Sequence, residues 1–150
     1  MPTVLPCYPQ IVEALTPAIR DLPGAIVTID GREGVGKTTL GRYLAWTFNV
    51  TLIETDLFLI PTRDYHIHLD DQVNRIIERR VTTPAPVIAE GIAILQLMKR
   101  IHRAPDFSIY LTRRGHESSK LLERRLSVYE AEYSPSASAS IAVEVELQAS

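Results

Sequence analysis

The chain has a single cysteine, almost no net charge and no long apolar segment, and each of these scarcities excludes a class of protein. Cys7 alone cannot form an internal disulfide, so a reducing cytoplasm is the expected compartment. No segment has the long uncharged apolar run of a membrane span or a signal peptide. The 16 basic and 18 acidic residues leave a net charge of −2, which gives no general attraction to nucleic acid or membrane. We expect partners of neither kind.

The size and composition of the chain indicate one globular domain. Its 150 residues are 45% hydrophobic and 23% charged, which is enough to bury a core and leaves no room for a second catalytic domain. Residues 1–24 are expected to form an N-terminal arm, loose over 1–9, followed by a helix that Pro17 shortens or kinks.

Apolar stretches alternate with helical patterns along the rest of the chain. The strands predicted from β-branched, apolar runs are 25–30, 50–54, 86–90, 107–111 and 141–147. The helices predicted between them are at about 37–48, 70–81, 92–103 and 116–132. This alternation favours an α/β three-layer sandwich, with a five-stranded parallel sheet and helices on both faces. Ligands of such sheets bind at the carboxyl ends of the strands.

A glycine-rich motif follows the first predicted strand. From Gly31 to Thr38 it reads G-x-x-x-x-G-K-T, the P-loop or Walker A motif. Its glycines allow consecutive N–H groups to turn inward around a phosphate chain, and the following helix adds unpaired N–H groups. Lys37 would reach the β- and γ-phosphates, and Thr38 would offer its hydroxyl to Mg²⁺. The residues expected to bind the nucleotide are Gly31, Glu33, Gly34, Val35, Gly36, Lys37, Thr38 and Thr39.

Acidic residues follow two of the other predicted strands. Asp56 comes after 50–54, where its carboxylate could take a proton from an acceptor hydroxyl or help hold a metal through water; a turn carboxylate that caps local N–H groups is the alternative. Glu90 ends 86–90, where P-loop proteins carry an acid that contacts Mg²⁺, although an exposed strand end is also compatible. Asp30 is expected to brace the loop backbone.

Basic residues are grouped after the strand at 107–111. Arg113 and Arg114 follow it directly, and Arg124 and Arg125 come further on. Phosphoryl transfer needs positive charge beside the phosphoryl group that is transferred, so at least one of these arginines is expected to act there. For each arginine taken singly, a solvated surface charge is the alternative.

A pair of histidines lies on the connection before the second predicted helix. His66 and His68 alternate, but no third ligand lies at a sensible spacing, so we assign them to a surface or substrate loop rather than to a metal. Asp70 is the expected N-cap of the helix that follows.

Together these motifs resemble the uridine kinase-like branch of the P-loop kinases, which includes nucleoside kinases, pantothenate kinases and phosphoribulokinases. The matching pieces are residues 29–40, Thr55-Asp56-Leu57-Phe58 and Ala89-Glu90-Gly91-Ile92. The resemblance implies that Asp56 is the general base for the acceptor hydroxyl and that Glu90 lies beside Mg²⁺. The P-loop roles fall on Lys37, Thr38 and Thr39. The expected catalytic residues are Asp56, Lys37, Arg113 and Arg114, and the expected metal-side residues are Thr38, Glu90 and Asp56.

The resemblance implies an ATP- and Mg²⁺-dependent kinase that transfers the γ-phosphate to a small hydroxyl-bearing substrate. A nucleoside such as uridine or cytidine is the leading acceptor. The segment 112–140 lacks the dense arginines of the family's lid, so we expect a reduced lid there and a flexible loop over 134–140. A P-loop ATPase, or a nucleotide-binding module without phosphotransfer, remains the alternative. The sequence leaves open the oligomeric state and the choice between ATP and GTP.

Overall fold

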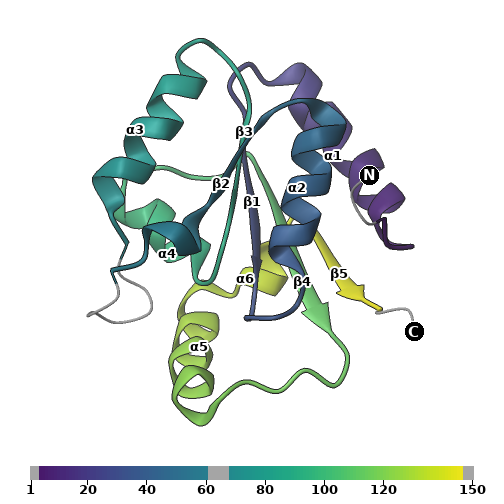
Figure 1. The fold of residues 1–150 in the computed structure, drawn as a ribbon, viewed down its shortest axis with the longest axis vertical. Helices are drawn as coiled ribbons and strands as arrows, with labels where there is room; N and C mark the ends of the chain where they lie inside the picture. The colour runs from purple at the N-terminus through teal and green to yellow at the C-terminus, as the bar shows by residue number, and fades with distance from the viewer. Residues whose placement is uncertain (1–3, 61–67, 147–150) are drawn as a thin grey trace.

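A parallel sheet forms the centre of the molecule (Figure 1). The computed structural model describes residues 4–60 and 68–146. Within them the strands are β1 (Ile26–Gly31), β2 (Thr51–Glu54), β3 (Val87–Glu90), β4 (Phe107–Arg113) and β5 (Ile141–Val145). All four neighbouring pairs are parallel, in the order β2-β3-β1-β4-β5. The predicted five-stranded parallel α/β fold is therefore confirmed.

Helices cover both faces of this sheet. They are α1 (Tyr8–Asp21), α2 (Lys37–Phe48), α3 (Asp70–Val81), α4 (Ile94–Arg100), α5 (Lys120–Tyr133) and α6 (Pro135–Ser138), with a short 3-10 helix η1 (Thr55–Phe58) after β2. The helices α1 and α2 lie on the right of the sheet in Figure 1, α3 and α4 lie on the left, and α5 lies below the carboxyl ends of the strands.

The core is divided by the sheet into two apolar clusters. Successive strand residues point to opposite faces, so in β1 Val27 and Ile29 pack against α1 and α2, whereas Ile26 packs on the side of α3 and α4. A third cluster joins α5 to Ile92 and Ala93, the residues that follow β3. The central strand β1 is buried along its whole length, which fixes the loop that follows it on a rigid support.

Prolines were responsible for two wrong predictions. The expected loose arm over 1–9 already contains the first residues of α1, which begins at Tyr8, and Pro17 lies inside this 14-residue helix without ending it. The expected flexible loop over 134–140 contains the short helix α6, which begins at Pro135. Proline suits the first turn of a helix because the N–H group that it lacks has no intrahelical partner there.

Other boundaries differ from the predictions by a few residues. The helices predicted at 92–103 and 116–132 are α4 and α5, and Ser119 is the N-cap of α5. Asp70 is not the N-cap of α3; Leu69 occupies that position, and the Asp70 carboxylate instead pairs with Arg100. His66 lies outside the described residues, and Nδ1 of His68 lies 3.1 Å from a guanidinium nitrogen of Arg100. No helix within 4–60 or 68–146 is long and apolar enough to cross a membrane.

Candidate nucleotide-binding site

The glycine-rich loop connects the end of β1 to the start of α2 at the carboxyl edge of the sheet. Gly34 and Gly36 have φ angles of +73° and +100°, which side-chain-bearing residues rarely adopt. Gly36 is the N-cap of α2, so the first N–H groups of that helix face the loop without intrahelical partners. A cavity of about 300 Å³ lies there, and its lining residues are Glu33, Gly34, Gly36, Lys37, Thr38, Thr39 and Asp56. The structure therefore brings Asp56 to the same cavity as the loop.

Lys37 is held across the loop. Its amine donates a hydrogen bond of 2.6 Å to the carbonyl oxygen of Arg32, and the residue is only 5% exposed. Burial lowers the pKa of Lys37, and the neighbouring carboxylates, Asp56 and Glu90 foremost, act in the opposite direction. The amine is therefore already positioned over the space that a phosphate chain would occupy.

Glu90 and Thr38 meet beside this cavity. The Thr38 hydroxyl donates to Oε1 of Glu90 over 2.9 Å, whereas Oε2 of Glu90 is buried and has no hydrogen-bond partner. Glu90 is 1% exposed, and burial raises the pKa of its carboxyl group, with a further rise from the charge of Asp56. A buried carboxylate oxygen without a partner, next to a hydroxyl, fits the oxygen ligands that Mg²⁺ prefers.

Most ligands of such an ion would not be protein side chains. Among residues 4–60 and 68–146 no group of three or more His, Cys, Asp or Glu side chains could hold a metal. An ion held by Thr38 and Glu90 would therefore depend on phosphate oxygens and water for the rest of its octahedral shell.

Asp56 is positioned by the residue before it and by the turn after β3. The Thr55 hydroxyl donates to the carbonyl oxygen of Glu90 over 2.8 Å, which fixes η1 against the end of β3. The approach is so close that a Cβ atom on Gly91 would lie 1.9 Å from the Thr55 hydroxyl oxygen and 3.4 Å from a carboxylate oxygen of Asp56. Asp56 itself is exposed, so its carboxylate is accessible to a ligand.

Asp30 makes the predicted bracing contact with the loop. Its Oδ1 accepts a hydrogen bond of 2.8 Å from the Gly31 N–H, and its Oδ2 accepts one from the Tyr129 hydroxyl on α5. Burial raises the pKa of Asp30 to about 6, although both hydrogen bonds lower it.

The arginines proposed for catalysis lie at different places. Arg113 donates a hydrogen bond of 2.9 Å to the carbonyl oxygen of Gly34 and so contacts the loop directly. Arg114 is exposed and lines a separate cavity beside the end of β5. Arg124 and Arg125 line a cavity between α4 and α5. Of these four, Arg113 is therefore the arginine that we associate with the loop.

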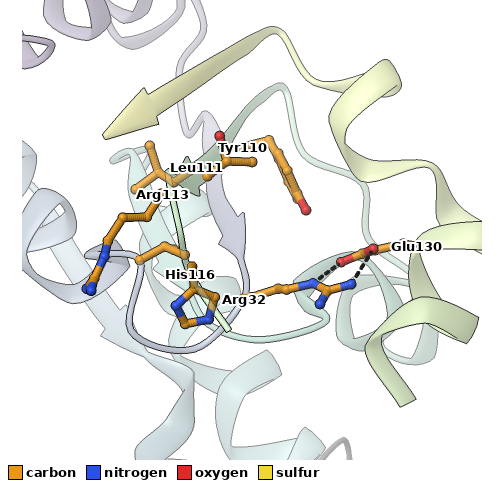
Figure 2. A pocket seen from close by; sticks show the side chains of 8 residues that line it. Arg32, Tyr110, Leu111, Arg113, His116 and Glu130 are labelled. Atoms are coloured by element: carbon orange, nitrogen blue, oxygen red, sulfur yellow. Dashed lines mark hydrogen bonds and ion pairs between the residues drawn. The ribbon is translucent and has the colours of Figure 1, made fainter. Parts of the chain in front are cut away.

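Two contacts of the loop were not predicted from the sequence. Arg32 forms ion pairs with Glu123 and Glu130 of α5, and Figure 2 shows its guanidinium group facing the Glu130 carboxylate. His116 lies beside the loop, with its Nε2 3.7 Å from a carboxylate oxygen of Glu33. Glu130 is 98 positions from Arg32, so no local pattern could have indicated the pair.

Comparisons with known proteins agree with this fold. No protein-family model matches the chain, and no curated protein matches it significantly. A possible uridine kinase from Bacillus stearothermophilus has 14% sequence identity and a TM-score of 0.64, covering 90% of this chain and 96% of that chain. Shikimate kinase from Acinetobacter baumannii, in complex with shikimate, has 16% sequence identity and a TM-score of 0.54. The match covers 90% of this chain and 89% of that chain. A shikimate kinase from Bacteroides thetaiotaomicron has 17% sequence identity and a TM-score of 0.52. The match covers 83% of this chain and 89% of that chain.

At these identities the comparisons define the fold. The chain shares the fold of these kinase structures, an α/β sandwich with a five-stranded parallel sheet, as the sequence predicted.

The contact at Gly91 can be tested by a double-mutant cycle. Gly91→Ala places a methyl group where the Thr55 hydroxyl lies, so we expect it to lower the free energy of unfolding by about 2 kcal/mol. In a Thr55→Ala background, Gly91→Ala should lower the free energy of unfolding by clearly less, because the clashing hydroxyl oxygen is absent. Denaturant titrations of the four proteins measure both costs. Equal costs of Gly91→Ala in the two backgrounds would show that this contact does not limit the position.

The carboxyl group of Asp30 should make stability depend on pH. Its pKa is raised from 3.8 to about 6, so the folded protein holds this proton more tightly than the unfolded chain does. The stabilisation is complete below pH 3.8 and is lost as the pH rises through about 6. Asp30→Asn cannot titrate, so between about pH 4 and 7 it should gain up to about 3 kcal/mol relative to the parent protein. Unfolding titrations across this range measure the difference, and a constant difference would exclude a raised pKa.

Proposed function

We propose that the protein is an ATP-dependent kinase that transfers the γ-phosphate to a hydroxyl group of a small molecule. The observation that carries this proposal is a cavity that is lined both by the phosphate-binding loop and by Asp56. A nucleotide-binding protein needs the loop alone, whereas a kinase also needs a base that faces the terminal phosphate. The acid outside the loop is therefore the feature that favours phosphotransfer.

The donor side uses the loop and the residues behind it. The backbone N–H groups from Gly34 to Thr39 would bind the β- and γ-phosphates, and Lys37 would contribute its charge. Thr38 and Glu90 would hold Mg²⁺, which when bound would neutralise charge on the phosphate oxygens.

The acceptor side uses Asp56. In the proposed step the acceptor oxygen forms a bond to the γ-phosphorus, its proton passes to the Asp56 carboxylate, and the bond from the γ-phosphorus to the β–γ bridging oxygen breaks, so that ADP leaves. Arg113 contacts the Gly34 carbonyl and lies within reach of the loop, so we assign it the positive charge that opposes the migrating group. Arg114 would act with it only after a change in its position.

A nucleoside such as uridine is the acceptor that we favour. The motifs at Asp56 and Glu90 resemble those of uridine kinase-like proteins, and the fold is similar to that of a possible uridine kinase. The same fold also occurs in a shikimate kinase bound to shikimate, another hydroxyl-bearing molecule. Uridine and shikimate both carry a hydroxyl group. A hydroxyl-bearing acceptor is therefore the general part of the proposal, and a nucleoside is its specific part.

A nucleotide hydrolase without an acceptor is the second candidate. The observation that favours it is the short connection between β4 and α5, residues 114–119, which leaves little chain to cover the site. Kinases exclude water from the transferred phosphate with covering segments, and an uncovered site would favour hydrolysis.

The experiment that decides between these functions measures ATP consumption with Mg²⁺ against a library of small hydroxyl-bearing acceptors that includes uridine and cytidine. Lys37→Ala should abolish tight triphosphate binding in calorimetry. Asp56→Asn should keep that binding and lose acceptor-dependent turnover by about 10²- to 10⁴-fold, because the proton has no other base at this position. Asp21→Asn, an exposed acid on α1, is the control and should behave as the parent protein.

Each outcome identifies a different function. Turnover that rises with an acceptor supports the kinase, and product analysis then names the acceptor. Hydrolysis without any stimulation supports the hydrolase, and binding without turnover supports a nucleotide-binding module. Parental transfer rates in Asp56→Asn would show that Asp56 is not the base.

A further inference from the structure

Arg32 connects the phosphate-binding loop to α5 through its whole guanidinium group. Nε donates to Oε1 of Glu130 over 2.7 Å, and Nη2 donates to Oε2 of the same carboxylate over 3.0 Å (Figure 2). Nη1 is paired with Glu123, which lies about two turns earlier on the same face of α5. A bidentate pair of this kind has a fixed geometry, so it holds the loop and the helix in one relative position.

A second contact joins the same two elements. The Tyr129 hydroxyl on α5 donates to the carboxylate of Asp30, the residue before the loop, and accepts a hydrogen bond from the Leu95 N–H. Tyr129 and Asp30 are both buried. The loop is therefore attached to α5 on two neighbouring sides, at Asp30 and at Arg32.

Both attachments are polar, and a cavity lies beside the attachment at Arg32. A cavity of about 300 Å³ lies between the loop and the end of β4. Arg32 and Glu130, both labelled in Figure 2, are in its wall. Because side chains do not fill this space, the ion pairs of Arg32 with Glu130 and Glu123 hold the loop to the helix there.

The backbone of Arg32 extends this connection to the nucleotide cavity. Its carbonyl oxygen accepts the 2.6 Å hydrogen bond from the Lys37 amine. One residue therefore binds α5 through its side chain and Lys37 through its main chain. A shift of α5 that moves the guanidinium group would also move the acceptor that positions the Lys37 amine.

We propose that Arg32 is a positioning residue that couples nucleotide binding in the phosphate-binding loop to the docking of α5. The inference rests on the proposed function only in that the loop must bind a nucleotide. The guanidinium group is occupied by two carboxylates of α5, so it acts on the nucleotide through the loop and through Lys37. Coupling of this kind is reciprocal, so a bound nucleotide also stabilises the docked position of α5.

The test compares the affinity for ATP with Mg²⁺ in three variants and the parent protein by calorimetry. Glu130→Gln keeps the shape of the side chain and removes the charge, and we expect its Kd to rise by about fivefold to tenfold. Arg32→Ala should show a similar rise. The double variant should be no weaker than Arg32→Ala alone, because both changes break one contact.

Asp70→Asn supplies a matched control. The Arg100–Asp70 pair has the same two-bond geometry, with distances of 2.9 and 3.1 Å, and its side chains are 30% and 32% exposed, against 23% and 30% for Arg32 and Glu130. It joins the start of α3 to the end of α4 and does not touch the loop. We expect Asp70→Asn to leave the Kd within about twofold of the parent value.

Hydrogen exchange provides a readout that a general loss of stability would not reproduce. Saturating nucleotide should slow amide exchange in α5 of the parent protein and of Asp70→Asn, and should do so much less in Glu130→Gln. An unchanged Kd in Glu130→Gln, or an equal rise in Asp70→Asn, would overturn the coupling.

The coupling and the proposed function fail in different ways. Binding that follows this pattern without phosphate transfer would support the coupling and overturn the kinase. A parent protein that binds no nucleotide would overturn both.

Discussion

The parallel pairing of β1 with β3 is the constraint on which the rest of the site depends. Ile29 is paired with Glu90, so the two strands end at the same level, one leading into the phosphate-binding loop and the other into Gly91. This register places the Glu90 carboxylate within hydrogen-bond distance of Thr38 at the start of α2. A slip of one residue would turn Glu90 toward the opposite face of the sheet and leave Thr38 without this partner. Apolar packing on both faces of β1 fixes the register.

The pairing of β2 with β3 positions Asp56 in the same way. Glu54 of β2 is paired with Glu90 of β3, so the turn into η1 begins at the level of the loop. The hydrogen bond from Thr55 to the Glu90 carbonyl then closes the turn onto β3. The candidate base and the candidate metal-side acid are thus positioned by one pair of neighbouring strands, which explains why both lie beside the loop.

The sequence predicted the residues whose positions follow from strand ends. The loop and Asp56 follow apolar runs and Glu90 ends one, and parallel strands bring their carboxyl ends to one edge of the sheet. It could not predict which acid would pair with which donor, because Arg32 and Glu130 meet only after α5 has packed on Ile92 and Ala93. The start of α1 was missed for a local reason, since prolines near Tyr8 suggested a loose arm but are compatible with the first turn of a helix.

The charges around Lys37 have a consequence for the form in which a ligand can enter. Burial lowers the pKa of this amine, and the carboxyl groups of Asp56, Glu90, Asp30 and Glu33 act in the opposite direction, so four acidic groups surround the cation of the loop. A polyphosphate would meet repulsion from those of these groups that are ionised, together with attraction from Lys37 and from the first N–H groups of α2. A divalent cation already bound to the polyphosphate would weaken the repulsion. The acidic surroundings of Lys37 would therefore favour entry of the cation complex over entry of the free anion.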